Sequence, residues 1–354
     1  MLKSIRIRNY RGFKDCKIDG LGRINIIAGM NNSGKTTLLE ALFLWSAAGS
    51  PQFAFNPTVV RVDVPVERAL LPGPIPNMMP AAGYMWSTAW QPMFHALATG
   101  TPIEIVGDHE SLGPLQLTIS TERSAALVLS PNADTSDDHP DDLLFRYGRR
   151  GDGELSLIRI KTQGSTRYDV ESTGEIEIPL QSVFEGMYNI AIDVERLSKL
   201  KKEKADASVL KAIQMVDASV KSIEIGVLDN HAMILADIGL PDRLPLQTLG
   251  AGPQRIATLA TSAAAAAGGV LLIDEFDAGL HHSKLGDVWR ALHAIAVDRD
   301  VQVFATTHSY ECVRAADDVL EDGEPHFYRL EDGQVTAYPP DVLADAIAAG
   351  MEVR

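Results

Sequence analysis

The stretch GMNNSGKT, residues 29–36, constrains this chain more than any other part of its sequence. It satisfies the pattern G-x-x-x-x-G-K-[ST], and it follows RINIIAG, an apolar segment typical of a strand. The leucines and phenylalanine of the next segment, TLLEALFLW, recur at helical spacing. Because strand, loop and helix follow in this order, the sequence predicts a phosphate-binding loop in an α/β fold, with the start of the helix adding its positive end.

Two side chains of this loop are expected to carry chemistry. The ammonium of Lys35 can reach the β and γ phosphates of a nucleotide, and the hydroxyl of Thr36 can ligate Mg²⁺.

Two later strand-like segments end in polar residues. VLLIDE, residues 270–275, delivers Asp274 and Glu275 after four apolar residues. Acidic residues often only cap strands, but beside a phosphate loop we expect Asp274 to hold the metal and Glu275 to act as general base. VQVFATTHS, residues 301–309, ends near His308. A lone histidine there is usually a satisfied surface or core residue, but in this order of motifs we expect it to sense the γ phosphate.

A second glycine turn, in LQTLGAGPQR, precedes a segment that favours a helix. Gly250 and Gly252 permit a close backbone approach, and the helix expected to begin near Gln254 offers free N–H groups. The plain alternative is a glycine turn that starts a helix. The position, about twenty residues before Asp274, favours an anion-binding device that reaches ATP held by another copy of the chain.

The segment DAGLHHSKL lies between the last two motifs. Asp277 follows Glu275 by two residues, where a turn could carry it to a neighbouring subunit. His281 and His282 lack a third ligand at metal-like spacing. Packing is the better interpretation, because several residues fit one helix face, namely His282, Leu285, Val288, Trp289 and Leu292.

The remaining chain predicts one elaborated α/β domain. Residues 2–9 alternate like a strand, and residues 50–92 are a proline-rich insertion. Short alternating segments between residues 101 and 172 predict an antiparallel sheet of hairpins, interrupted by a solvated acidic loop at 132–142. Residues 186–222 have a helical pattern, and Asp332-Gly333 favours a tight hairpin turn.

Composition excludes several classes of protein. The formal charge of −15 argues against a surface coated for nucleic acid, although 32 Lys and Arg leave room for a local basic groove. Two distant cysteines form no disulfide framework and suit a reducing cytoplasm. No segment approaches the roughly 20 apolar residues of a membrane helix, and we expect a cytoplasmic protein that does not bind membranes.

Five segments together resemble the ABC-type AAA ATPases of the OLD, RecF and SMC group: IRIRNYRGFKD, GMNNSGKTTLLEAL, TLGAGPQR, LLIDEFDAGLHHS and VFATTHSYEC. The resemblance is greatest to small stand-alone ATPases related to OLD proteins. It implies an ABC-type P-loop ATPase head spanning residues 1–354, with a mixed β-sheet lobe and a helical subdomain at 186–245 that leads to the signature motif. It also implies two ATP molecules, with Mg²⁺, sandwiched in a homodimer.

The resemblance also implies roles for individual residues. Asp274 and Glu275 form the Walker B motif, Asp277 lies in the D-loop, and His308 is the switch histidine. The signature motif spans residues 248–253, with nucleotide contacts from Thr248, Gly250 and Gly252. A Q-loop glutamine should touch the metal or the attacking water, and Gln181 is the candidate, with Gln91 as the second choice. The remaining nucleotide-binding residues are Arg11 and the Walker A residues Gly29, Asn31, Asn32, Ser33, Gly34, Lys35, Thr36 and Thr37.

Some features depart from the family pattern. Ala251 stands between the glycines where relatives tend to have a polar residue, and DEFDAGL replaces the commoner DE-x-E-N-GL. Both put the rate of turnover in question more than nucleotide binding. Only 46 residues follow His308, fewer than the Toprim nuclease domain of OLD proteins needs, so we expect no cleavage chemistry in cis.

Several functions agree with these observations. The first is an ATPase whose dimer clamps DNA, in repair or in defence against foreign DNA. The second is an ATP-driven switch for a separately encoded effector, such as a Toprim-like nuclease or a toxin. A transporter subunit is disfavoured by the RNYRGF start, and a GTPase by the absence of an N-K-x-D motif. An idle nucleotide-dependent scaffold is disfavoured because both carboxylates and the histidine are present.

Overall fold

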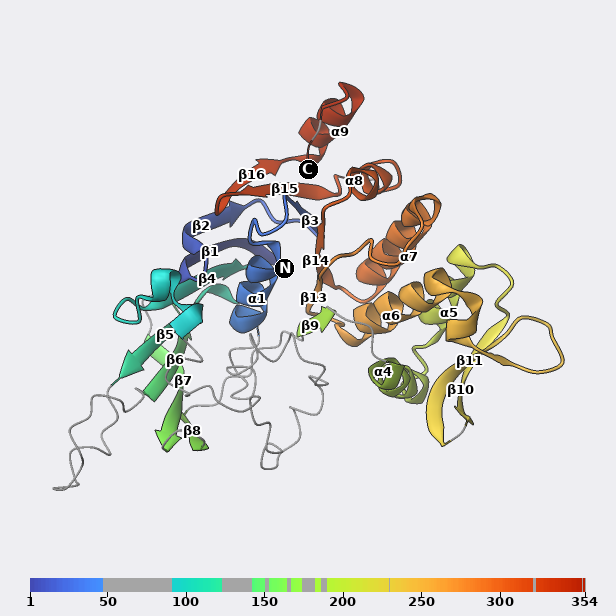
Figure 1. Ribbon diagram of the computed structural model, residues 1–354, viewed down its shortest axis with the longest axis horizontal. Coiled ribbons are helices and arrows are strands. Elements are labelled where there is room, and N and C mark those ends of the chain that lie inside the picture. Colours follow the sequence, from blue (N-terminus) through green and yellow to red (C-terminus); the bar gives the residue numbers. More distant parts are fainter. Residues whose placement is uncertain are drawn as a thin grey trace.

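The computed structural model describes residues 1–46, 91–122, 142–149, 153–163, 167–173, 182–185, 190–228, 230–320, 323–351 and 353. These residues form three sheets with helices packed against them (Figure 1). Several expectations fall outside the described residues: most of the proline-rich insertion, one alternating segment of the expected sheet of hairpins (124–130), most of the acidic loop, and Gln181.

A six-stranded sheet forms the centre of the molecule, in the order β16-β15-β3-β14-β13-β9. The five strands from β15 to β9 are parallel, and β16 closes an antiparallel hairpin with β15. As expected, Asp332 and Gly333 make the tight turn of that hairpin, with φ of 47° and 74°. The strands are β3 (Ile24–Ala28), β9 (Ser182–Glu185), β13 (Val270–Ile273), β14 (Gln302–Thr307), β15 (His326–Glu331) and β16 (Gln334–Tyr338).

Both faces of this sheet are covered at β3, β13 and β14, and every residue of these three strands is buried. Alternate side chains of a strand point to opposite faces. Val270 and Leu272 pack with α1 (Lys35–Ser46), whereas Leu271 and Ile273 pack with the helices of the other face. Those helices are α6 (Ala251–Ala265), α7 (Leu285–Asp298), α8 (Tyr310–Asp317) and α9 (Pro340–Ala348) (Figure 1).

A seven-stranded antiparallel sheet covers α1 from the other side, in the order β2-β1-β4-β5-β6-β7-β8. The expected sheet of hairpins is confirmed for those of its segments that the structure describes. The indole N–H of Trp45 in α1 donates to the carbonyl of Leu115 in this sheet at 3.1 Å. The strands are β1 (Leu2–Tyr10), β2 (Phe13–Asp19), β4 (Ile103–His109), β5 (Gly113–Glu122), β6 (Asp142–Arg149), β7 (Gly153–Gln163) and β8 (Arg167–Thr173).

The interpretation of residues 132–142 as a solvated loop was wrong for the last residue of that range. Asp142 is the first residue of β6, and only 1% of it is exposed. Its carboxylate lies 3.4 Å from Arg159 Nη1 on the neighbouring strand. Burial of this carboxylate therefore depends on a cross-strand guanidinium that the sequence pattern did not reveal.

Residues 186–245 are not helical throughout. Helices α4 (Ile190–Lys202) and α5 (Ala207–Val216) confirm the helical pattern of 186–222. A small antiparallel sheet then follows, with strands β10 (Ser222–Leu228), β11 (His231–Asp237) and β12 (Leu244–Pro245). The expectation of a helical subdomain was therefore wrong for its second half, where Ile223, Ile225 and Val227 alternate with other residues in a strand pattern.

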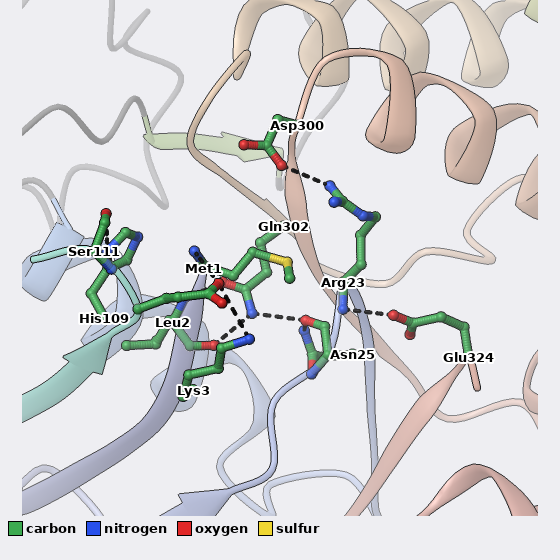
Figure 2. Close-up of polar contacts among 12 residues, drawn as sticks. Met1, Leu2, Lys3, Arg23, Asn25, His109, Ser111, Asp300, Gln302 and Glu324 are labelled. Atoms are coloured by element: carbon green, nitrogen blue, oxygen red, sulfur yellow. Dashed lines mark hydrogen bonds and ion pairs between the residues drawn. The ribbon is translucent and has the colours of Figure 1, made fainter. Parts of the chain in front are cut away.

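Gln302, the first residue of β14, joins the two large sheets. Its Oε1 accepts the backbone N–H of Leu2 at 2.8 Å. Its Nε2 donates to the carbonyls of Leu2 at 2.8 Å and Gly22 at 2.7 Å. Figure 2 shows these contacts beside Met1 and Lys3. One buried amide thus satisfies three backbone groups where β1 meets the parallel sheet.

Replacing Gln302 by Leu is expected to lower the free energy of unfolding by about 3 kcal/mol, because three backbone groups lose their partner in the interior. Urea unfolding followed by circular dichroism measures this. Gln334→Leu, on the exposed side of β16, is the matched control and should leave the midpoint almost unchanged. Equal midpoints for Gln302→Leu and the wild type would contradict the role of this amide.

None of the helices in the described ranges is both long and apolar enough to span a bilayer.

Candidate active site

The phosphate loop connects the end of β3 to the start of α1. Gly29 has φ of 155° and Gly34 has φ of 104°. A Cβ on Gly29 would lie 2.3 Å from the carbonyl oxygen of Leu330, so this position leaves no space for a side chain. Asn32 adopts a left-handed conformation with φ of 65°. The glycines of the motif are thus demanded by the path of the loop, and α1 begins at Lys35, as expected.

Lys35 lies across this loop. Its Nζ donates to the carbonyl of Gly29 at 2.7 Å and to that of Met30 at 3.0 Å. Burial lowers the pKa of the Lys35 ammonium, and the nearby carboxylates of Asp274 and Glu275 oppose this shift. The Lys35 ammonium and the first backbone N–H groups of α1 lie in the same region, and both attract negative charge.

Asp274, directly after β13, lies between two hydroxyl groups. One carboxylate oxygen accepts from Thr36 Oγ1 of α1 at 2.9 Å, and the other accepts from Thr306 Oγ1 of β14 at 2.6 Å. Hydroxyl and carboxylate oxygens are the ligands that Mg²⁺ prefers, usually together with phosphate oxygens of a substrate. Within the described residues no three His, Cys, Asp or Glu side chains form a metal cluster. The residues present fit a Mg²⁺ ion bound together with phosphate, because Thr36 supplies a hydroxyl oxygen and Asp274 a carboxylate oxygen at the phosphate loop.

Glu275 has an unusual backbone for a residue with a side chain, with φ of 49°. Its N–H donates to Thr306 Oγ1 at 3.0 Å. Its carbonyl accepts from Arg255 Nη2 at 3.3 Å and from the Ala278 N–H at 2.9 Å. These bonds hold the left-handed conformation, and the carboxylate itself is exposed. Sparsely populated backbone conformations cluster at active sites, where the surrounding structure maintains them.

Thr307 ties the segment around His308 to Asp277. Its hydroxyl donates to the Asp277 carboxylate at 2.5 Å and accepts the N–H of Ser309 at 3.0 Å. His308, between the two bonded residues, is exposed. Asp277 is therefore bonded within its own chain, and its approach to a neighbouring subunit stays a prediction. An open cavity of about 350 Å³ adjoins this segment, lined by Asp277, Leu280, His282, Leu285, Ser309 and Glu311.

The residues that were expected to pack on one helix face after Asp277 do so, with the exception of His282. His282 is exposed, and its ring lies 4.1 Å from that of His281, so its assignment to the packed face was wrong. It belongs to a short 3-10 turn, His282–Lys284, that precedes α7. Trp289 stacks on Phe276, the residue after Glu275, with ring centroids 3.7 Å apart. The buried residues of this face are Leu285, Val288, Trp289 and Leu292.

The second glycine turn precedes α6, which begins at Ala251 and not near Gln254. Gly250, with φ of 108°, links α6 to a 3-10 turn, Leu246–Leu249. Gly250 and Ala251 are exposed, so the first turn of α6 lies at the surface. Thr248 is also exposed, and its hydroxyl donates to the carbonyl of Pro245 at 2.7 Å. The exposed start of a 15-residue helix is free to contact another molecule.

Arg11 makes an ion pair with α1. Its Nη1 lies 2.7 Å from Glu40 Oε2, and Glu40 is one turn past Thr36 with 1% of its surface exposed. The backbone N–H of Arg11 donates to Met93, in a 3-10 turn that begins at Gln91. Arg11 and the second-choice glutamine therefore lie close together, and their contact with nucleotide stays a prediction.

Gln181 lies outside the described residues. Strand β9 begins at the next residue, and β9 and β13 are parallel. The carbonyl of Glu185, at the other end of β9, accepts the N–H of Asp274 at 2.9 Å. In the described part of the chain, the carboxyl end of β9 is thus the part that adjoins Asp274.

Three residues of the site were missed from the sequence. Thr306 and Thr307 are buried hydroxyls directly after three apolar residues at the end of β14, in VFATTHS, and this placement was an available signal. Arg255 follows the glycine turn directly. Nothing in its sequence context showed that it would reach the carbonyl of Glu275 across 20 positions.

The phosphate loop follows β3, and the carboxylate pair Asp274 and Glu275 follows β13. Strand β14, which ends next to His308, lies between these two strands in the sheet. This arrangement defines an ABC-type P-loop ATPase. A family profile described as "AAA domain, putative AbiEii toxin, Type IV TA system" matches residues 119–314, and one described as "AAA ATPase domain" matches residues 1–64. The first of these profiles covers more than half of the chain, so the chain belongs to that family of AAA domains. It is an ATP-hydrolysing enzyme.

Individual relatives cover different shares of the chain. It is 23% identical over 349 residues to an ATP/GTP phosphatase of Helicobacter pylori, with 91% of this chain and 89% of that protein covered. It is 31% identical over 62 residues to the DNA replication and repair protein RecF of Bacillus cytotoxicus, which covers 18% of this chain and 17% of RecF. An SMC head crystallised with the C-winged helix domain of ScpA covers 96% of this chain and 97% of its own, with 12% identity and a TM-score of 0.48.

Proposed function

We propose that this ATPase binds ATP with Mg²⁺ and hydrolyses it while two copies of the chain are closed around the nucleotide. The observation that carries the proposal is the arrangement at Asp274. Its carboxylate is held by Thr36 of the phosphate loop and by Thr306, and the next residue, Glu275, is fixed in a left-handed conformation with its carboxylate exposed.

Each residue then has a defined task. Thr36 and Asp274 would hold Mg²⁺, which would neutralise charge on the phosphates when bound. Glu275 takes a proton from the attacking water. Lys35 and His308 stabilise negative charge on the transferring phosphoryl group. Thr306 holds Asp274 and Glu275 in a fixed position relative to each other, because its hydroxyl bonds both the Asp274 side chain and the Glu275 backbone.

The dimer part of the proposal is supported by the exposed start of α6. Free N–H groups and the positive end of a helix attract phosphate. Gly250 and Gly252 carry no side chain to block that approach. In the proposed dimer, this turn reaches ATP bound on the phosphate loop of the second copy.

The test is the molecular mass in solution of Glu275→Gln, with and without ATP and Mg²⁺. We expect a monomer that becomes a dimer when both are added, and no dimer when Gly252→Asp is also present. A Cβ on Gly252 meets only Val216 at 3.5 Å, so the second change fits the fold and acts through its charge. Gly100→Asp, at an exposed glycine where an added Cβ would meet nothing within 4 Å, is the matched control and should still dimerise. A mass that ATP does not change would overturn the dimer.

We propose that the ATP-bound dimer acts on DNA, in repair or in defence against foreign DNA. The match to part of RecF supports this output. The alternative is a switch for a separately encoded effector, and the formal charge of −15 favours it. Binding of the trapped Glu275→Gln dimer to duplex DNA at increasing salt separates the two. Affinity that falls steeply with salt supports phosphate contacts, and no binding at low salt supports the effector.

A further inference from the structure

A buried polar cluster lies between α6 and β9, the strand that pairs with β13 beside Asp274. It contains Glu185 at the end of β9, Asp193 and Arg196 of α4, and Ser262 of α6. All four are at least 93% buried. Helices α4 and α6 pack side by side here, and α6 also contacts β9 (Figure 1). Charged groups in such a position are costly unless they are paired, so their arrangement requires an explanation.

Arg196 connects the members of the cluster. Its Nη1 donates to Ser262 Oγ at 2.7 Å and to Glu185 Oε2 at 3.1 Å, and it lies 3.9 Å from Asp193 Oδ1. The Ser262 hydroxyl in turn donates to Glu185 Oε2 at 2.9 Å. Asp193 accepts the hydroxyl of Thr258 at 2.5 Å. Helix α6 is therefore bonded to the cluster at two successive turns.

The same cluster reaches the metal site through the backbone. The carbonyl of Glu185 accepts the N–H of Asp274, while its side chain is bonded to α6. A second connection runs from Arg255, near the start of α6, to the carbonyl of Glu275. The backbones of Asp274 and Glu275 are thus both linked to α6, the helix whose first turn is proposed to contact the nucleotide of the second copy.

We propose that Arg196 is a positioning residue, which with Glu185 couples α6 to Asp274 and Glu275 of its own chain. Contact of nucleotide with the first turn of α6 then sets the position of the metal-site carboxylate and of the base. The direction of coupling rests on the proposed dimer, whereas the effect of Arg196 on turnover does not require it.

The charge balance of the cluster agrees with this role. Burial raises the pKa of the Asp193 carboxyl to about 7, while bonds from Thr258 and the charge of Arg196 act in the other direction. Near neutral pH a large share of Asp193 is protonated, which leaves Arg196 to pair with Glu185. Because this pKa is raised in the folded chain, the stability it contributes is full below the ordinary Asp value and is lost as pH rises through about 7.

The experiment compares Arg196→Met with Arg159→Met. Arg159 also pairs with a buried carboxylate, Asp142, but in the seven-stranded sheet. Both changes are expected to lower the unfolding temperature, because each leaves a carboxylate without its guanidinium. Below that temperature, Arg196→Met should reduce kcat about 10- to 100-fold with the Kd of a fluorescent ATP analogue changed less than about twofold. Arg159→Met should keep the kcat of the wild type.

A third variant separates positioning from stability. Glu185→Gln combined with Arg196→Met removes both charges, so we expect the unfolding temperature to recover while kcat stays low. Recovery of kcat together with stability would overturn the proposal, as would a wild-type kcat in Arg196→Met. These results are independent of the mass measurement on Glu275→Gln. A chain that never dimerises but needs Arg196 for turnover would therefore contradict the proposed dimer alone.

Discussion

Replacement of Glu275 by Gln is expected to lower kcat for ATP hydrolysis by about 100- to 10,000-fold, the range that a general base contributes. The amide has the same shape as the carboxylate but cannot take a proton from water. The backbone bonds of Glu275 to Thr306, Arg255 and Ala278 are unaffected, so the loop geometry persists. Phosphate release measures kcat, and a fluorescent ATP analogue measures affinity, which should stay within about threefold because no ground-state contact is lost.

Glu203→Gln is the control for this change. Glu203 is exposed beyond the end of α4, so its replacement removes the same charge without touching the site. Wild-type turnover in Glu275→Gln would show that another group accepts the proton.

Replacement of Lys35 by Met is expected to reduce kcat/KM about 100- to 1,000-fold, because preorganised charge at the phosphates is lost. Methionine preserves much of the apolar chain of Lys35 but cannot donate to the carbonyls of Gly29 and Met30. Unlike the change at Glu275, this one should weaken ATP binding as well, since the ammonium attracts phosphate in the ground state. Calorimetric titration with ATP and Mg²⁺ measures this difference.

Lys14→Met is the control, because Lys14 is an exposed lysine of β2. Its replacement should leave ATP binding unchanged. Equal ATP affinity for Lys35→Met and wild type would contradict the placement of the phosphates at this loop.

The chemistry-bearing motifs were predictable because each depends on a few consecutive residues. The strand, glycine loop and helix of residues 24–46 occur where the pattern placed them, since a loop of this path excludes side chains at Gly29. The carboxylate pair follows a strand because four apolar residues precede Asp274. Parallel strands then bring their carboxyl ends to one edge of the sheet, which places Asp274 near Thr36.

The local sequence pattern did not predict secondary structure or burial correctly where these depend on packing against distant residues. The alternation in residues 222–228 belongs to a strand of the small sheet, although the region was assigned to a helical subdomain. Asp142 ends an acidic segment that is typical of a loop, yet it is buried with its carboxylate 3.4 Å from Arg159 of the neighbouring strand β7. His282 fits a helical face by spacing, yet the helix begins after it.

The sequence by itself determined the strand, glycine loop and helix of residues 24–46, the place of Asp274 and Glu275 after a strand, and the α/β class, because these depend on residue types at short, fixed spacing. Only the tertiary structure decided that Thr306 bonds Asp274 and that Arg255 reaches the backbone of Glu275. The same holds for Arg196, which lies between Glu185 and Ser262. Such contacts join positions 11 to 66 residues apart, and their energy depends on burial and geometry that exist only after the sheets and helices have packed.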